Sequence, residues 1–155
     1  MSAKDFENHL MLFMLTKKKN ALRILLVDDD IDLLMLMERK LQQNGYIVET
    51  AASLPEAEYI LSLFKPNLVL IDINIAGDDG RRLCWKIKHK DCEHTPKVIL
   101  MSGRYYPTSR ILFFGADEFI AKPFVSEFVL QKIAKLLHQE QPVPVTEPIQ
   151  SCIEE

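Results

Sequence analysis

The sequence predicts an α/β fold: a single doubly wound domain in which one parallel sheet is flanked by helices. Short apolar runs, typical of buried strands, alternate with helix-like segments five times along the chain. The run Leu68–Ile71 is too short for a helix and rich in branched residues, as expected of a strand buried on both faces. The length of 155 residues and the ordinary globular composition suit about one domain.

Five segments are predicted to form the strands of this sheet. Each is a short run of apolar or β-branched residues bounded by turn residues. Pro66-Asn67, for example, opens the run that ends at Asp72, and a Gly- and Asp-rich stretch follows it. In chain order the predicted strands are Arg23–Val27, Tyr46–Ala51, Leu68–Asp72, Lys97–Met101 and Glu118–Ala121.

Five helices are predicted between and after these strands. The first has Leu34, Met37 and Leu41 at one-face spacing, and Asn44-Gly45 terminates it. Pro55 stands in the first turn of the second helix, where its missing N–H does no harm. The predicted helices are Ile31–Leu41, Leu54–Phe64, Gly80–Lys88, a short one around Thr108–Phe114, and Val125–His138.

The two ends of the chain differ from the central domain, which we predict to span residues 21–139. Residues 1–20 are predicted to form a helical extension, because carboxylates come early and three lysines late, which suits the helix dipole. Such a helix either packs on its own domain or frays, or it serves a homodimer or another partner. Residues 140–155 contain three prolines and are predicted to be a flexible tail.

Charge, cysteine content and hydropathy exclude several classes of protein. The net charge of −3 does not suggest a nucleic-acid-binding domain with a basic surface. Cys84, Cys92 and Cys152 are odd in number and widely spaced, which argues against a disulfide framework or a zinc site and fits a reducing cytoplasm. No apolar run approaches the ~20 residues of a membrane span, and the N-terminus does not have the order of a secretory signal.

Polar residues follow the predicted strands where those strands end. Asp28 and Asp29 follow the first strand, Asp72 ends the third, and Ser102 and Lys122 follow the fourth and fifth. The carboxyl ends of parallel strands share one edge of a sheet, where open α/β folds place their ligands. Converging carboxylates would repel, and Mg²⁺ relieves that repulsion. A carboxylate can also attack phosphorus, so phosphoryl transfer is the indicated chemistry. Taken alone, Asp72 could equally be a strand-end carboxylate that caps the next helix.

With these motifs in this order, the chain resembles the receiver domains of two-component response regulators, such as the single-domain chemotaxis regulator. The resemblance covers about residues 22–138, and five pieces at the right strand ends carry it. These are Leu26–Asp30, Leu70–Asn74, Asp79-Gly80, Met101–Gly103 and Lys122–Phe124. It implies a flavodoxin-like, five-stranded parallel sheet of order 2-1-3-4-5, an arrangement that is also a general example of doubly wound folds.

The resemblance also implies roles for individual residues. Asp72 would be the phosphoacceptor, taking a phosphoryl group from a histidine kinase or phosphotransfer protein in a cytoplasmic signalling pathway. Asp28 and Asp29, with Asp72 and the backbone carbonyl of Asn74, would hold Mg²⁺. Such a domain catalyses its own phosphorylation and dephosphorylation, but it is primarily a switch that acts on a downstream protein or output domain.

The remaining implied roles concern the switch. Lys122 would be the invariant lysine, Ser102 the switch hydroxyl and Phe119 the switch aromatic residue. The peptide bond before Pro123 would be cis, as the family has it.

The sequence departs from the family pattern in five places. Ala76 stands where the family usually has a proline, and the segment from 102 to 115 is about two residues short by our alignment, which predicts a shortened or displaced fourth helix. Phe113 and Phe128 fall at positions that are usually polar, and reflect either local repacking or an apolar partner surface. Trp85 also falls at a usually exposed position and could pack under the N-terminal extension.

Two alternatives belong to other classes. Asp28 to Asp32 also fits the nucleophile motif of haloacid-dehalogenase phosphohydrolases, with Asp28 as nucleophile and Asp30 as acid/base. Against it, no later acidic pair follows the fifth strand and there is no room for a cap domain. The other alternative is a receiver that acts only as a binding module, which the intact site set argues against.

Overall fold

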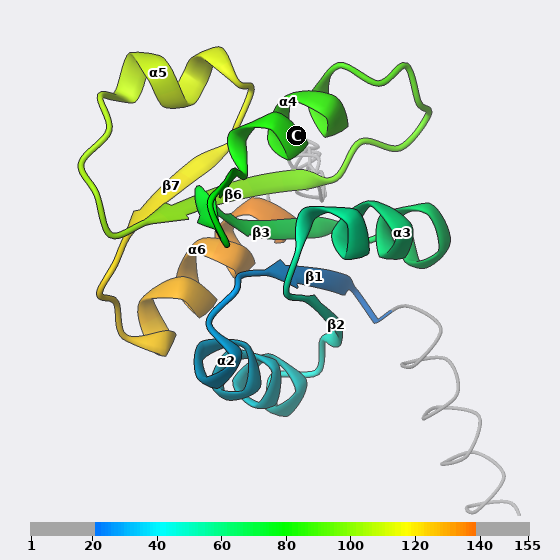
Figure 1. Ribbon diagram of the computed structural model, residues 1–155. Helices are drawn as coiled ribbons and strands as arrows, with labels where there is room; N and C mark the ends of the chain where they lie inside the picture. The colour runs from blue at the N-terminus through cyan, green and yellow to red at the C-terminus, as the bar shows by residue number, and fades with distance from the viewer. Residues whose placement is uncertain (1–20, 139–155) are drawn as a thin grey trace, which may run out of the picture.

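A computed structural model describes residues 21–138 and confirms the predicted five-stranded parallel sheet (Figure 1). The hydrogen-bonded order is β2-β1-β3-β6-β7, which is the expected order 2-1-3-4-5 for the five strands of the main sheet. All four pairings are parallel. The strands are β1 (Arg23–Val27), β2 (Ile47–Ala51), β3 (Leu68–Asp72), β6 (Lys97–Ser102) and β7 (Glu118–Ala121).

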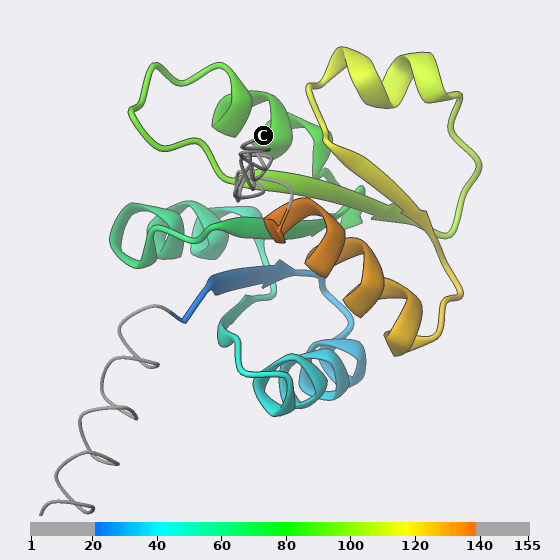
Figure 2. The ribbon, with the colours of Figure 1, turned by 180° about the vertical axis from the view of Figure 1, so that it is seen from behind.

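Five helices cover the two faces of this sheet, as Figures 1 and 2 show from opposite sides. α3, α4 and α5 lie on one face, and α2 and α6 lie on the other. Two apolar clusters, one on each side, form the core because strand residues alternate between the faces. The helices are α2 (Ile31–Gln43), α3 (Leu54–Phe64), α4 (Arg81–Lys88), α5 (Thr108–Phe113) and α6 (Ser126–His138).

The central strand β3 is buried along its whole length. Its neighbours β1 and β6 pair with it in register, with Val27 opposite Ile71 and Met101 opposite Asp72. This explains why its apolar run is continuous rather than alternating, since both faces of a central parallel strand are covered. It also brings the carboxyl ends of β1, β3 and β6 to one edge of the sheet.

Local signals set the helix boundaries. Asp30 is the N-cap of α2, and its carboxylate accepts a hydrogen bond from the Leu33 amide at 3.0 Å. Ser53 caps α3 through the Glu56 amide, and Pro55 stands in the first turn as predicted. α2 continues to Gln43, two residues beyond the prediction, and Gly45 has the positive φ of +87° that ends the turn after it.

The structure adds one element that the sequence did not predict. β4 (Asn74–Ile75) and β5 (Asp78–Asp79) form a two-stranded antiparallel ribbon between β3 and α4. Ala76 and Gly77, at the turn, both have positive φ, of 51° and 90°, the signature of a type I′ hairpin. Two-residue strands are too short to leave a periodic pattern in a sequence.

The predicted N-terminal extension (1–20) and tail (140–155) lie outside the described residues. Among the helices described, none combines the length and apolar character needed to cross a bilayer.

Candidate functional site

Three carboxylates meet at the carboxyl edge of the sheet. Asp28 follows β1, Asp72 ends the neighbouring β3, and Asp29 stands in the loop after β1; one oxygen of each lies within 4.8 Å of the others. Asp28 and Asp72 are only 1% and 7% exposed, whereas Asp29 faces solvent. The predicted convergence of these side chains therefore occurs in the structure.

Lys122 enters this cluster from the loop after β7. Its Nζ lies 2.5 Å from Oδ2 of Asp28 and 3.5 Å from Oδ2 of Asp72. Three ionised carboxylates and one ammonium leave two negative charges in a partly buried site, which a divalent cation balances. The ligand atoms that this site offers are all oxygens, the type that Mg²⁺ prefers, and water and phosphate oxygens would complete the coordination.

Burial raises the pKa of Asp72 above its ordinary value of 3.8, because desolvation penalises the charged form. The nearby Lys122 ammonium opposes this change, and the Asp28 charge adds to it. The amide of Asn74 also donates a hydrogen bond that favours the carboxylate. A cation at this position would favour the ionised form further.

The backbone around the cluster holds its members in place. Oδ1 of Asp28 accepts a hydrogen bond from the backbone amide of Asp30 at 3.0 Å. Oδ2 of Asp29 accepts one from the backbone amide of Ala76 at 2.9 Å. The second contact ties the loop after β1 to the turn of the β4–β5 ribbon. Asp30, in contrast, is engaged in capping α2. The phosphohydrolase alternative would need that carboxylate as an acid/base.

Gly80 is required by the close packing of the Asp79-Gly80 motif against the end of β3. A Cβ at this position would lie 2.0 Å from the carbonyl oxygen of Asp72 and 2.9 Å from a methyl of Ile71. Its amide donates to the carbonyl of Ile73 at 2.7 Å. Only glycine permits this close approach, so the residue fixes how the ribbon folds back on the end of β3.

Sequence reasoning did not identify Arg81 and Asp79 as an interacting pair. The Arg81 guanidinium contacts both oxygens of Asp79, with distances of 2.7–3.1 Å, and lies 5.1 and 5.2 Å from the ring centroids of Tyr106 and Phe114. The side-chain hydrogen bond from Arg81 lowers the pKa of Asp79. Arg81 thus connects the ribbon beside the carboxylates to the segment around α5. No sequence signal marked the aromatic contacts, since they depend on tertiary structure.

Ser102 and Phe119 lie on the neighbouring strands β6 and β7. Ser102 is buried at the end of β6, one residue beyond the partner of Asp72, and its Oγ accepts the amide of Arg104 at 3.0 Å. Phe119 is partly buried and packs against the apolar cluster on the α3, α4 and α5 face. The peptide bond between Lys122 and Pro123 is cis, as expected.

The departures from the family pattern are visible as well. α5 has only six residues, in keeping with the shortened helix predicted from the segment length. Phe113 on α5 is 72% exposed and Phe128 on α6 is 42% exposed. Trp85 is also exposed, and its ring stacks on His89 at 4.4 Å. Whether it also contacts the N-terminal extension concerns residues outside the described range.

Comparison with known proteins gives one consistent family. The model of the response regulator receiver domain matches residues 24–134. The chain is 35% identical over 119 residues to the transcriptional regulatory protein YvcP of Bacillus subtilis, covering 76% of this chain and 49% of that protein. It is 33% identical over 124 residues to the probable transcriptional regulator ycf27 of Cyanophora paradoxa, covering 79% of this chain and 51% of the relative. The chain therefore spans about half the length of the curated relatives it matches.

Solved structures agree with this result over nearly their whole length. A CheY-like receiver domain protein from Methanospirillum hungatei is 32% identical with a TM-score of 0.70, covering 77% of this chain and 96% of that one. A signal receiver domain from Bermanella marisrubri is 26% identical with a TM-score of 0.67, covering 76% and 99%. With the family model matching most of the described residues, this chain belongs to the response regulator receiver domains of two-component signalling.

Proposed function

We propose that Asp72 is the residue that accepts the phosphoryl group, in a reaction supported by Mg²⁺. The observation that carries this proposal is the convergence of Asp28, Asp29 and Asp72, with Lys122 beside two of them. Asp72 ends the central strand, where a donor can approach from the edge of the sheet. Asp28 is less suited to attack, because Lys122 and the Asp30 amide engage both of its oxygens.

In the proposed reaction, an oxygen of Asp72 attacks the phosphorus of a phosphohistidine. The bond between phosphorus and the imidazole nitrogen breaks, and the nitrogen keeps the electron pair and takes up a proton. Lys122 pairs with the charge on the phosphoryl oxygens. The backbone carbonyl of Asn74 and the carboxylates of Asp28, Asp29 and Asp72 would hold Mg²⁺, and the bound cation would supply positive charge to neutralise the transferred group.

Ser102 and Phe119 are the proposed switch residues. The Ser102 hydroxyl currently accepts a hydrogen bond, so its own proton is available for a phosphoryl oxygen. Movement of Ser102 would open space near Phe119, which lies on the adjacent strand. The proposed partners are a histidine kinase or phosphotransfer protein and a downstream protein or output domain, the latter because the relatives are named as transcriptional regulators. We propose a cytoplasmic location and no direct nucleic-acid contact by this domain.

Labelling with acetyl phosphate and Mg²⁺ tests the proposal. The label should be an acyl phosphate, labile to hydroxylamine, and Asp72→Asn should abolish it. Asp30→Asn is the matched control and should keep the label, because Asn caps a helix as well as Asp does. Label on Asp28 in the unmodified chain would contradict the proposal and favour the phosphohydrolase alternative.

A further inference from the structure

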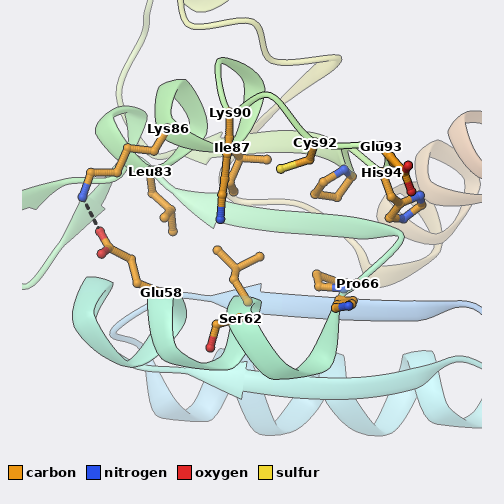
Figure 3. A pocket seen from close by; sticks show the side chains of 13 residues that line it. Glu58, Ser62, Pro66, Leu83, Lys86, Ile87, Lys90, Cys92, Glu93 and His94 are labelled. Carbon is orange, nitrogen blue, oxygen red and sulfur yellow. Dashed lines mark hydrogen bonds and ion pairs between the residues drawn. The ribbon is translucent and has the colours of Figure 1, made fainter.

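A cleft lies between α3 and α4, away from the carboxylates. Its volume is about 580 Å³, and Figure 3 shows the side chains that line it. Leu61, Leu83 and Ile87 provide an apolar wall, and the loop after α4 closes one side. An ion pair of 2.6 Å between Lys86 and Glu58 spans the two helices and is drawn as a dashed line in Figure 3.

The cleft is lined by three lysines and two glutamates, which give it a net charge of +1. Lys65, Lys86 and Lys90 line it together with two carboxylates, of which Glu58 is already paired with Lys86. Within residues 21–138, neither Lys65 nor Lys90 has a carboxylate partner. Figure 3 shows Lys90 pointing from the α4 side toward α3. An apolar wall with unpaired ammonium groups suits an acidic segment that also carries branched apolar side chains.

The cleft reaches the edge of the sheet at which α6 ends. Pro66 and Pro96 line the cleft and stand just before β3 and β6, so this is the amino edge. α6 runs back from the carboxyl edge (Figure 2), and Lys132 in its middle already contacts Glu118 at the start of β7, at 2.9 Å. The chain therefore leaves α6 at the amino edge, on the opposite face of the sheet from the cleft.

We propose that residues 139–155 of this same chain occupy the α3–α4 cleft. This segment contains four glutamates and neither lysine nor arginine, and Val143, Val145, Ile149 and Ile153 are spaced along it. Its length permits a span of about 50 Å when extended, which is enough to round the amino edge. Glutamates would face Lys65 and Lys90, and the branched residues would cover Leu61, Leu83 and Ile87.

Charge favours this segment over the other end of the chain. Residues 1–20 contain four lysines against two carboxylates, so their net charge has the same sign as the unpaired charge of the rim.

The proposal is also independent of Asp72, because the cleft and the carboxylates are separate sites. An experiment on the cleft needs no phosphoryl donor, and its result leaves the proposed function untouched.

The cysteines of the chain permit a direct test. Cys92 is exposed at the cleft, Cys152 is in the segment, and Cys84 is buried. A short bismaleimide should join Cys92 to Cys152 within one chain, at a rate that does not depend on protein concentration. The control is C92S/R39C, which moves the thiol to the exposed face of α2, on the side of the sheet where α6 packs. We expect the unmodified chain to react about tenfold faster than this control, because docking raises the effective concentration.

Charge reversal tests the basis of recognition. K65E/K90E should lower the cross-linking rate to that of the thiol control. Adding E154K/E155K to this variant should restore the rate. R39E/R110E, which changes charges away from the cleft, should keep the wild-type rate. Equal rates in the unmodified chain and the thiol control would overturn the proposal, as would failure of the restoring substitutions. Cross-links that join two chains and rise with concentration would overturn it too, since the occupant would then be a second copy.

A second measurement leaves the domain itself unchanged. I149S/I153S in the full chain should shift the backbone amide resonances of residues 58–66 and 83–96, because the branched side chains would leave the apolar wall. Amides of α2 should keep their positions. Unchanged resonances along the cleft would also overturn the proposal.

Discussion

At the level of single residues, the burial of Asp28 and Asp72 determines the electrostatics of the carboxyl edge. One ammonium, that of Lys122, serves both carboxylates at 2.5 and 3.5 Å. Asp29 adds a third charge from the solvent side. The arrangement leaves carboxylate repulsion that a divalent cation would relieve, so cation affinity should depend steeply on each carboxylate.

Asp28→Asn/Asp29→Asn should therefore weaken Mg²⁺ binding by about tenfold or more, because the cation loses charged oxygen ligands. Calorimetric titration of the purified chain with MgCl₂ measures the effect. Asp32→Asn, on the exposed first turn of α2, is a control of the same chemistry and should keep the wild-type affinity. An unchanged titration in the double variant would show that the cation binds elsewhere.

The ion pair between Asp79 and Arg81 predicts how the stability of the domain depends on pH. Its pKa lies below the ordinary value of 3.8 because Arg81 donates hydrogen bonds to it. The pair therefore contributes stability that is present above pH 3.8 and is lost as the pH falls through the lowered pKa of the folded state. Asp79→Asn should reduce the free energy of unfolding at pH 7 by at most about 1 kcal/mol, since the pair is partly exposed.

Urea denaturation of the wild type and Asp79→Asn at pH 7, 4 and 3 measures this difference. The two curves should converge toward the lowest pH. A difference that stays constant over the range would mean that the Asp79 charge is not what stabilises the ribbon.

At the level of elements, the sequence predicted the five strands and five helices because each has its own length, period and bounding turn. It also predicted that Asp28, Asp29, Asp72, Ser102 and Lys122 follow strand ends, and a parallel sheet collects strand ends at one edge. The β4–β5 ribbon was missed because two-residue strands have no period. The contacts of Arg81 with Tyr106 and Phe114 were missed because they join distant segments.

The ribbon depends on Gly80, which gives an element-level prediction. Gly80→Ala should destabilise the domain by about 2–3 kcal/mol, because the added methyl would overlap the Asp72 carbonyl oxygen. Gly103→Ala is the matched control, as a Cβ there meets nothing within 4 Å, and it should change the stability little. Urea denaturation at pH 7 compares the two. Equal effects would mean that the ribbon moves freely to accept the methyl group.

At the level of the whole molecule, the proposed function requires the carboxylate cluster to influence a surface some distance away. Two residues connect the carboxylate cluster to the segment around α5. Ser102 bonds to the loop that leads to α5, and Arg81 contacts Tyr106 and Phe114. Phe113 and Phe128 are exposed on α5 and α6. Moving a two-state equilibrium from mostly off to mostly on needs about 5.5 kcal/mol. In the proposed switch, charge-assisted hydrogen bonds to the phosphoryl group and repacking of Phe119 would contribute to this free energy.

Ser102→Ala should therefore still accept a phosphoryl group but lose most of the response around α5. Backbone NMR shifts of residues 104–120, recorded with and without beryllofluoride, measure that response. Ser109→Ala on exposed α5 is a control that should keep it. If Ser102→Ala shows the full wild-type shifts, coupling does not pass through this hydroxyl.

The parallel sheet also has a consequence for how the domain reaches its structure. Partners such as Ile24 and Leu68, or Ile99 and Glu118, are far apart in the chain, so no strand pair of the main sheet can close as a local hairpin. Bringing these distant residues together costs the chain conformational entropy before any pairing forms. This cost slows folding relative to that of a helical bundle. The central strand β3 can gain full protection only after both of its neighbours have arrived.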